Sequence, residues 1–207
     1  MKTVGILGGT FDPIHKGHLH IAEQVLSRLN LDELHFLPCA SPVHRNLPQA
    51  ASCDRLQMIK LGISGCAEFR LNTTELDRGG QSYMIDTLRQ IYEQGEFDSI
   101  FLIIGVDAFN GFQNWKSPDE ILQLVNLVIC ARPGFKLNWS NYSAQRIESV
   151  EALKRNINGS ILALEIDENS CSSSQIKRQL QSSERTRATG CLPESVLNFI
   201  VSNHLYE

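Results

Sequence analysis

The sequence predicts an α/β protein built on a doubly wound parallel sheet. Two observations point to this fold class. Short apolar runs typical of buried strands alternate with longer segments of helical periodicity, and the first apolar run ends in a glycine turn that opens a helix. The 207 residues contain no internal repeat or long linker, so we expect one domain over residues 1–207.

The expected strands are short and mostly apolar. Residues 99–104 read Ser-Ile-Phe-Leu-Ile-Ile, which is typical of a central parallel strand buried on both faces. The run stops at Gly105, where a strand end is expected. The remaining strands are expected at residues 3–7, 33–37, 69–72, 127–130 and 161–166.

The expected helices lie between these strands. Residues 17–29 carry apolar side chains at helical spacing, and a second helix should begin near Ser52 or Asp54, either of which could cap it. After the break at residues 79–80, Ser82 could cap a third helix. Two helices, at about residues 173–181 and 193–202, should close the chain and pack on the same core. Residues 38–51 and 135–149 look irregular.

Composition and charge exclude some partners. The formal net charge is -4, so the chain lacks the basic excess of a non-specific nucleic-acid binder. No apolar stretch approaches the roughly 20 residues of a membrane span, and no leader is visible after Met1. We therefore expect a cytoplasmic protein that contacts neither nucleic acid nor membrane; the sequence leaves a homo-oligomer open.

The cysteines are spaced widely. Their even number would permit disulfides, but the chain is not a small secreted scaffold. We expect reduced and mostly buried thiols, since free cysteine behaves as a small hydrophobe. The six are Cys39, Cys53, Cys66, Cys130, Cys171 and Cys191.

The glycine turn after the first strand is suited to phosphate. Gly8 and Gly9 would let the backbone approach an anion, and the next helix offers unpaired N–H groups. His15 and His18 are three residues apart at the helix start, so both can face one ligand and donate to a phosphate in the transition state. The alternatives are a plain turn followed by two surface histidines, or a zinc site, although no third ligand lies nearby.

A longer motif contains this turn. Residues 8–18 read Gly-Gly-Thr-Phe-Asp-Pro-Ile-His-Lys-Gly-His, which resembles the (H/T)xGH signature of the nucleotidyltransferase superfamily. Further stretches resemble, in order, motifs of nicotinate-nucleotide adenylyltransferases. They are Ser-Pro-Val-His-Arg at 41–45, Glu-Leu-Asp-Arg at 75–78, Ser-Tyr-Met-Ile-Asp-Thr-Leu at 82–88, Ile-Ile-Gly-Val-Asp at 103–107, Phe-Gln-Asn-Trp at 112–115, Arg-Pro-Gly at 132–134 and Ser-Ser-Ser-Gln-Ile-Lys at 172–177.

The resemblance implies a Rossmann-like nucleotidyltransferase fold with C-terminal helices. It also implies transfer of AMP from ATP to nicotinate mononucleotide in NAD biosynthesis, with Mg²⁺ delivered by ATP and no metal held by the protein. The implied catalytic residues are His15 and His18. The implied ATP-binding residues are Gly8, Gly9, Thr10, Phe11, His15, His18, Gly105, Ser172, Ser173, Ser174 and Lys177. The implied mononucleotide-binding residues are His44, Arg45, Ser82, Tyr83, Met84, Asp107, Trp115, Lys116 and Arg132.

The chemistry of these side chains suits the implied roles, but simpler interpretations stay open. Trp115 offers a flat face for a pyridinium ring, or it is a core tryptophan. Asp107 follows a buried strand and could accept ribose hydroxyls, or it caps a helix. Arg132, His44 and Arg45 suit a phosphate, although Arg45 could simply be solvated. Ser172 to Lys177 could form an anion site or an ordinary serine cap.

The chain departs from the family pattern at Lys16, Met84 and Lys177. Lys16 should matter little, and Met84 would matter little if its backbone amide, together with that of Lys116, holds the nicotinate carboxylate as the family implies. Lys177 replaces the usual arginine and lacks its bidentate fork. Arg178 adjoins it but points about 100° away on a helix.

Three other functions remain open on the sequence alone. A sister nucleotidyltransferase, for example a phosphopantetheine adenylyltransferase or a cytidylyltransferase, would share the glycine–histidine motif without the Trp115 block. An NAD-dependent oxidoreductase is disfavoured, because the glycines do not read G-x-G-x-x-G and the second strand ends at Pro38 rather than at an acid. A non-catalytic nucleotide sensor would bind without releasing pyrophosphate.

Overall fold

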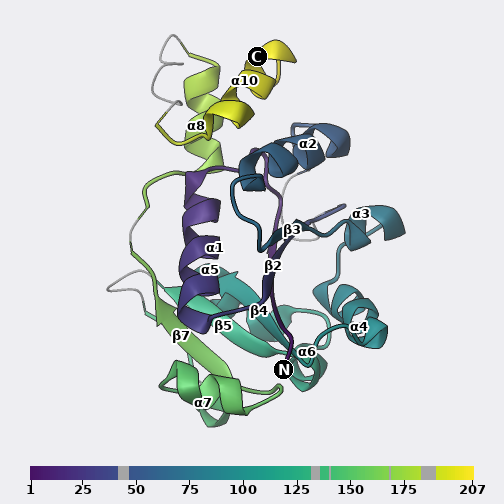
Figure 1. Cartoon of the computed structure of the whole chain (residues 1–207), viewed down its shortest axis with the longest axis vertical. Helices are drawn as coiled ribbons and strands as arrows, with labels where there is room; N and C mark the ends of the chain where they lie inside the picture. Colours follow the sequence, from purple (N-terminus) through teal and green to yellow (C-terminus); the bar gives the residue numbers. More distant parts are fainter. Residues whose placement is uncertain (42–46, 132–135, 140, 168, 183–189) are drawn as a thin grey trace.

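The computed structural model describes residues 1–41, 47–131, 136–139, 141–167, 169–182 and 190–207. Within these residues, seven strands form one parallel sheet in the order β3-β2-β1-β4-β5-β7-β6 (Figure 1). This confirms the expected doubly wound parallel sheet. The strands are β1 (Thr3–Gly9), β2 (Glu33–Pro38), β3 (Phe69–Leu71), β4 (Ser99–Gly105), β5 (Asn126–Ala131), β6 (Arg146–Ile147) and β7 (Ile161–Glu165).

Helices cover both faces of the sheet. One face carries α1 (Lys16–Leu29), α2 (Ser52–Ile63), α7 (Val150–Arg155), α8 (Ser173–Leu180) and α10 (Glu194–Ser202). The other carries α4 (Met84–Gln94), α5 (Val106–Asn110) and α6 (Pro118–Leu124). The α3 helix (Thr74–Arg78) and the short 3-10 helices η1 (Phe112–Asn114) and η2 (Ser143–Gln145) complete the described elements.

Alternate side chains of each central strand supply the two cores. In β4, Ile100 and Leu102 pack under α4 and α6, whereas Phe101 and Ile103 pack under α1. Both sets are almost fully buried, which is why the strand reads as one apolar run instead of an alternating pattern.

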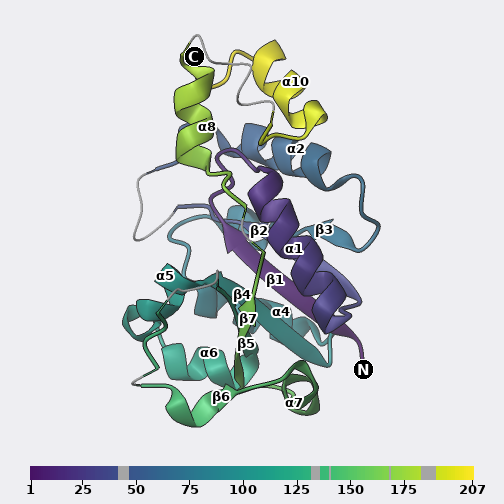
Figure 2. The ribbon, with the colours of Figure 1, turned by 90° about the vertical axis from the view of Figure 1, so that its left-hand side faces the viewer.

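Helices α8 and α10 lie side by side beyond α2, at the end of the molecule opposite α7 (Figures 1 and 2). Their apolar side chains Ile176, Leu180, Val196 and Ile200 belong to the same cluster of buried residues as the inner face of α1. The C-terminal helices therefore extend the core beside the start of α1.

The strand order reverses between β1 and β4, which are neighbours although four helices separate them in sequence. Ligands of open α/β sheets bind outside the carboxyl ends of the strands at such a point. Here that edge carries the two glycines at the end of β1 and Asp107 after β4.

The structure corrects the expected helix caps. Ser52 is the first residue of α2, whose cap, Ala51, makes no side-chain hydrogen bond. Ser82 lies before Tyr83, the cap of α4, and its Oγ instead accepts from the N–H groups of Ala40 at 2.8 Å and Ser41 at 3.3 Å. Ser82 therefore holds the chain that leaves β2.

The structure also corrects the expectation for the cysteines. Cys171 and Cys191 form a disulfide, with Cα atoms 5.4 Å apart. One precedes α8 and the other precedes α10, so folding brings together residues that lie far apart in sequence. The other cysteines are free thiols but none is fully buried, and Cys53 is exposed.

Helices long and apolar enough to cross a lipid bilayer are absent from the described part of the chain.

Candidate active site

Gly8 and Gly9, which we expected in a turn, are the last two residues of β1, and the glycine turn at this strand end is shaped by close contacts. A Cβ atom added to Gly8 would lie 2.9 Å from Cε of Met84, and one added to Gly9 would lie 2.9 Å from the Phe11 ring. A side chain at Gly9 would clash with the buried Phe11 ring, whereas one at Gly8 would displace only the tip of the flexible Met84 side chain. Phe11 has a positive φ of 49°, and its ring is buried in the core, which leaves only its backbone to serve a ligand.

Two stacked imidazoles follow the turn. The rings of His15 and His18 are 3.8 Å apart and 25° from parallel. His15 is the N-cap of α1, where its Nδ1 accepts the Gly17 N–H at 3.1 Å. Only 6% of His15 is exposed, so the interpretation as a surface histidine is wrong for this residue.

Burial lowers the pKa of His15 from 6.5 to about 4. The ring is therefore neutral at pH 7, because desolvation disfavours the charged imidazolium. With Nδ1 accepting from Gly17, the proton of the neutral ring belongs on Nε2. His15 thus has one N–H to offer to a ligand.

The start of α8 packs against the start of α1. A Cβ atom on Gly17 would lie 3.1 Å from the carbonyl oxygen of Cys171, and the Lys16 N–H donates to the Cys191 carbonyl at 2.8 Å. Ser173 Oγ donates to the Pro13 carbonyl at 3.1 Å. The structure thus brings the serine stretch beside the histidine motif, although Pro13 and Ser173 are 160 residues apart in sequence.

The serines themselves have different partners. Ser172 is the N-cap of α8 and accepts the Gln175 N–H at 3.3 Å, so the simple serine cap describes its side chain. Ser174 is exposed at the same helix start.

Lys177 and Arg178 point to different partners. Lys177 Nζ lies 2.8 Å from Oδ2 of Asp12, inside the glycine–histidine motif. Arg178 Nε instead donates to the carbonyl of Ser174 on its own helix. Of these two cations, Lys177 is the one joined to the turn.

A second group of candidate residues surrounds the start of α4. Lys116 Nζ lies 4.6 Å from the centre of the Tyr83 ring and 2.8 Å from Asp86 Oδ2. Trp115 is half-buried and packs edge-on against Phe112, with ring centres 5.3 Å apart. Trp115 is thus neither a fully buried core residue nor a free surface ring.

Met84 lies between the two groups, because it starts α4 and its side chain reaches Gly8. Asp107 is exposed in the first turn of α5, whose cap is Gly105, so the cap interpretation for Asp107 is wrong. His44, Arg45 and Arg132 lie outside the described residues.

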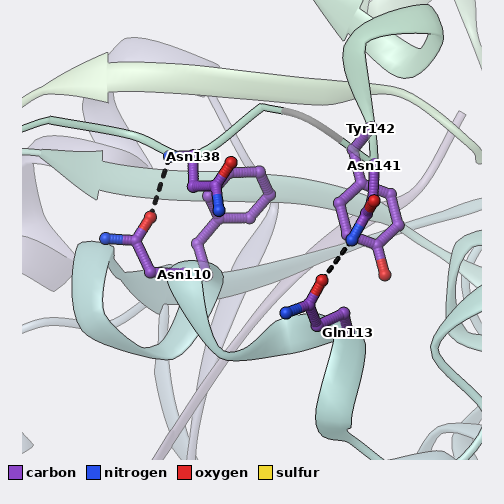
Figure 3. Close-up of a pocket in the computed structure, with 6 residues that line it drawn as sticks. Asn110, Gln113, Asn138, Asn141 and Tyr142 are labelled. Carbon is purple, nitrogen blue, oxygen red and sulfur yellow. Dashed lines mark hydrogen bonds between the residues drawn. The ribbon is translucent and has the colours of Figure 1, made fainter.

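A small polar pocket supports the segment between Asp107 and Trp115 (Figure 3). Asn110 Oδ1 accepts the Asn138 N–H at 2.9 Å, and Asn141 Nδ2 donates to Gln113 Oε1. The side chains of these residues face one another with Phe109 and Tyr142 alongside. The pocket is too shallow to enclose a nucleotide and serves to fasten the following loop onto α5 and η1.

Sequence reasoning missed Arg55. Only 1% of it is exposed, and its guanidinium donates to the carbonyls of Thr10 at 2.8 Å and Cys39 at 2.9 Å. It therefore joins the glycine turn to the end of β2. No local pattern signals this role, since an arginine in the first turn of a helix usually faces water.

Within the ranges that the structure describes, no three His, Cys, Asp or Glu side chains are placed to hold an ion.

The fold and the site define the chain as a member of the cytidylyltransferase-like nucleotidyltransferases, whose family model matches residues 6–179. The relatives of the chain show which branch of this family it belongs to. A probable nicotinate-nucleotide adenylyltransferase of Methylococcus capsulatus is 36% identical, over 98% of this chain and 99% of its own. One from Pseudomonas putida KT2440 is 37% identical, over 100% and 91%. The chain belongs to the nicotinate-nucleotide adenylyltransferase family, which confirms the resemblance found in the sequence.

Solved structures agree on the fold. A nicotinic acid mononucleotide adenylyltransferase from Plasmodium falciparum superposes with a TM-score of 0.76 at 17% identity, over 100% of this chain and 98% of that one. A putative nicotinate-nucleotide adenylyltransferase from Vibrio parahaemolyticus gives a TM-score of 0.67 over 100% and 96%, also at 17% identity.

Proposed function

We propose that this chain transfers AMP from ATP to nicotinate mononucleotide, giving deamido-NAD and pyrophosphate in NAD biosynthesis. The observation that carries the proposal is the stacked pair His15 and His18 at the start of α1, beside a glycine turn at the point where the strand order reverses. Membership of the family and its named relatives supports the choice of acceptor.

The reaction needs no covalent enzyme intermediate. A 5′-phosphate oxygen of the mononucleotide attacks the α-phosphorus of ATP, the new P–O bond forms, and the bond to the bridging oxygen of pyrophosphate breaks. The attacking group is already an anion, so catalysis consists of alignment and charge stabilisation.

The residues of the turn and of α8 would hold ATP. His18 would contact the reacting α-phosphate, and the neutral His15 would donate to the phosphate chain from Nε2. The backbone from Gly8 to Phe11 and the start of α8, with Ser172, Ser173, Ser174 and Lys177, would receive the remaining phosphates. Gly105 would lie against the nucleotide at the end of β4.

The residues around α4 would hold the mononucleotide. Trp115 and Tyr83 offer aromatic faces to the pyridinium ring, and the backbone N–H groups of Met84 and Lys116 would hold its carboxylate. Asp107 would accept ribose hydroxyls from its exposed position. Ser82 fixes the start of the loop with His44 and Arg45, which with Arg132 would bind the phosphate.

Mg²⁺ would arrive with ATP, because phosphate oxygens are the hard ligands that this ion prefers and it needs few from the protein. When bound, it would neutralise charge on the departing pyrophosphate. We place the reaction in the cytoplasm.

His18→Ala tests the proposal. We expect turnover to fall by at least about a hundredfold, because a donor to the charged phosphate is lost in the transition state. Pyrophosphate release is measured with Mg²⁺, ATP and nicotinate mononucleotide. CTP, nicotinamide mononucleotide and phosphopantetheine form the comparison panel.

His20→Ala is the matched control, since His20 lies on the same helix and its ring contacts the Asp167 carbonyl instead of the turn. It should keep wild-type turnover. A His18→Ala enzyme within about threefold of wild type would remove His18 from the chemistry. Faster release with another acceptor or with CTP would replace the proposed substrates.

A further inference from the structure

Asp12 is a buried carboxylate on which three distant parts of the chain meet. Its Oδ1 accepts the Ala50 N–H at 3.1 Å and the Tyr206 hydroxyl at 2.8 Å. Its Oδ2 accepts the Gln49 N–H at 2.9 Å and Lys177 Nζ at 2.8 Å. Only 4% of Asp12 is exposed, so these donors take the place of water.

Tyr206 reaches Asp12 from the C-terminal tail. After α10 the chain turns back, with the Leu205 N–H donating to the Ile200 carbonyl at 3.0 Å. Tyr206 is 4% exposed and packs in the cluster that also holds the inner face of α1. Burial and the neighbouring carboxylate raise the pKa of its phenol, so the hydroxyl stays a neutral donor.

Lys177 is the direct counter-ion of Asp12. Burial opposes ionisation of the carboxyl, but the hydrogen bond from Lys177 and those from Gln49, Tyr206 and Ala50 outweigh it and lower the pKa. Asp12 therefore remains an anion that fixes the ammonium beside the glycine turn. A second cation in place of Tyr206 would compete with Lys177 for the charge of Asp12. The neutral phenol donates a hydrogen bond to Oδ1 and does not compete for that charge.

We propose that Tyr206 is a positioning residue for ATP, which acts through Asp12 to hold Lys177 at the phosphate turn. Without the phenol, Oδ1 keeps only the Ala50 N–H and Oδ2 keeps the Gln49 N–H. The carboxylate then has one fewer donor to fix its orientation, so it holds Lys177 less firmly in place. The inference rests on the proposed function in one respect, the contact of Lys177 with the phosphates of ATP.

Tyr206→Phe tests the inference, because it removes the hydroxyl and keeps the buried ring. We expect the Kd for Mg·ATP to rise about fivefold, a usual size for coupling between groups in contact. The Kd for nicotinate mononucleotide should stay within about twofold, since its site lies around α4. Both are measured by calorimetry well below the melting temperature of each variant.

Two further variants separate positioning from a loss of stability. Tyr92→Phe removes a phenol from an exposed position on α4 and should bind ATP like the wild type. Lys177→Met should weaken ATP binding by itself, and adding Tyr206→Phe to it should cause no further loss, because the two act in series.

Three results would overturn the inference. The first is wild-type ATP affinity in Tyr206→Phe, and the second is wild-type ATP affinity in Lys177→Met. The third is a double variant in which Tyr206→Phe weakens ATP binding by the same factor as it does in the wild type. The proposed function is judged apart, by pyrophosphate release from the wild type. The affinity series needs no turnover, so it decides the role of Tyr206 whether or not that assay succeeds.

Discussion

At the scale of single residues, the two histidines of the motif are not equivalent. His15 uses Nδ1 to cap α1 and is buried, whereas His18 is half-buried and its ring stacks on the ring of His15. The lowered pKa of His15, about 4, makes it a neutral donor and not a cation in the free protein. Its position at the helix start supplies positive potential without a formal charge.

This pKa predicts an acid-sensitive fold. The unfolded chain takes up a proton on His15 as the pH falls below about 6.5, but the folded chain does so only near pH 4. Stability is therefore lost as the pH falls through this window, by up to about 3 kcal/mol. His15→Asn retains a capping acceptor and removes the titration.

Between pH 7 and pH 5, we expect the free energy of unfolding of this variant to fall by about 2 kcal/mol less than that of the wild type. Urea unfolding at the two pH values provides the measurement. An equal loss in both proteins would mean that folding does not lower the pKa of His15.

Trp115 carries the second residue-scale prediction. Trp115→Ala should raise the KM for the mononucleotide by about two- to tenfold through loss of ring stacking, with a smaller effect on the KM for ATP. Trp115→Phe, which keeps an aromatic face, should recover most of this loss. Equal rises in both KM values would assign Trp115 to packing against Phe112 alone.

At the scale of elements, the disulfide ties the segment before α8 to the segment before α10, and the Cys191 carbonyl accepts the Lys16 N–H at the start of α1. Its cysteines are 20 residues apart, and a loop of that size contributes about 3 kcal/mol in the chain-entropy model. Reduction should lower the melting temperature by several degrees.

Thiol titration of the unfolded protein checks this pairing. It should count four thiols before reduction, for Cys39, Cys53, Cys66 and Cys130, and six after it. Cys191→Ser, which frees Cys171, should give five without a reductant. Six thiols in the unreduced wild type would contradict the bond.

The elements also show where sequence reasoning works. Strands such as β4 were predicted closely because burial on both faces leaves a continuous apolar run. The caps were mistaken because a serine has several partners within reach: Ser82 bonds to the chain after β2, and only distant contacts decide this. The short helices α3 and α7 were missed because one or two turns carry too little periodicity.

At the scale of the whole molecule, the first and last motifs of the sequence were predicted separately, and only the fold brings them together. The glycine–histidine motif and the serine stretch are each continuous in sequence, and both were identified because they resemble motifs of a known family. The packing of α8 on α1, the counter-ion role of Asp12 and the buried Arg55 depend on contacts across the chain. No pattern in a single sequence encodes such pairings.

The bond from Tyr206 to Asp12 spans 194 residues and therefore has a consequence for synthesis. Asp12 is synthesised 194 residues before its phenolic partner, which is added about 10 to 40 seconds later at ordinary elongation rates. During that interval the carboxylate has only water in place of the phenol. On a translating ribosome, the nascent chain thus carries its phosphate turn early and completes it only after Tyr206 has been added.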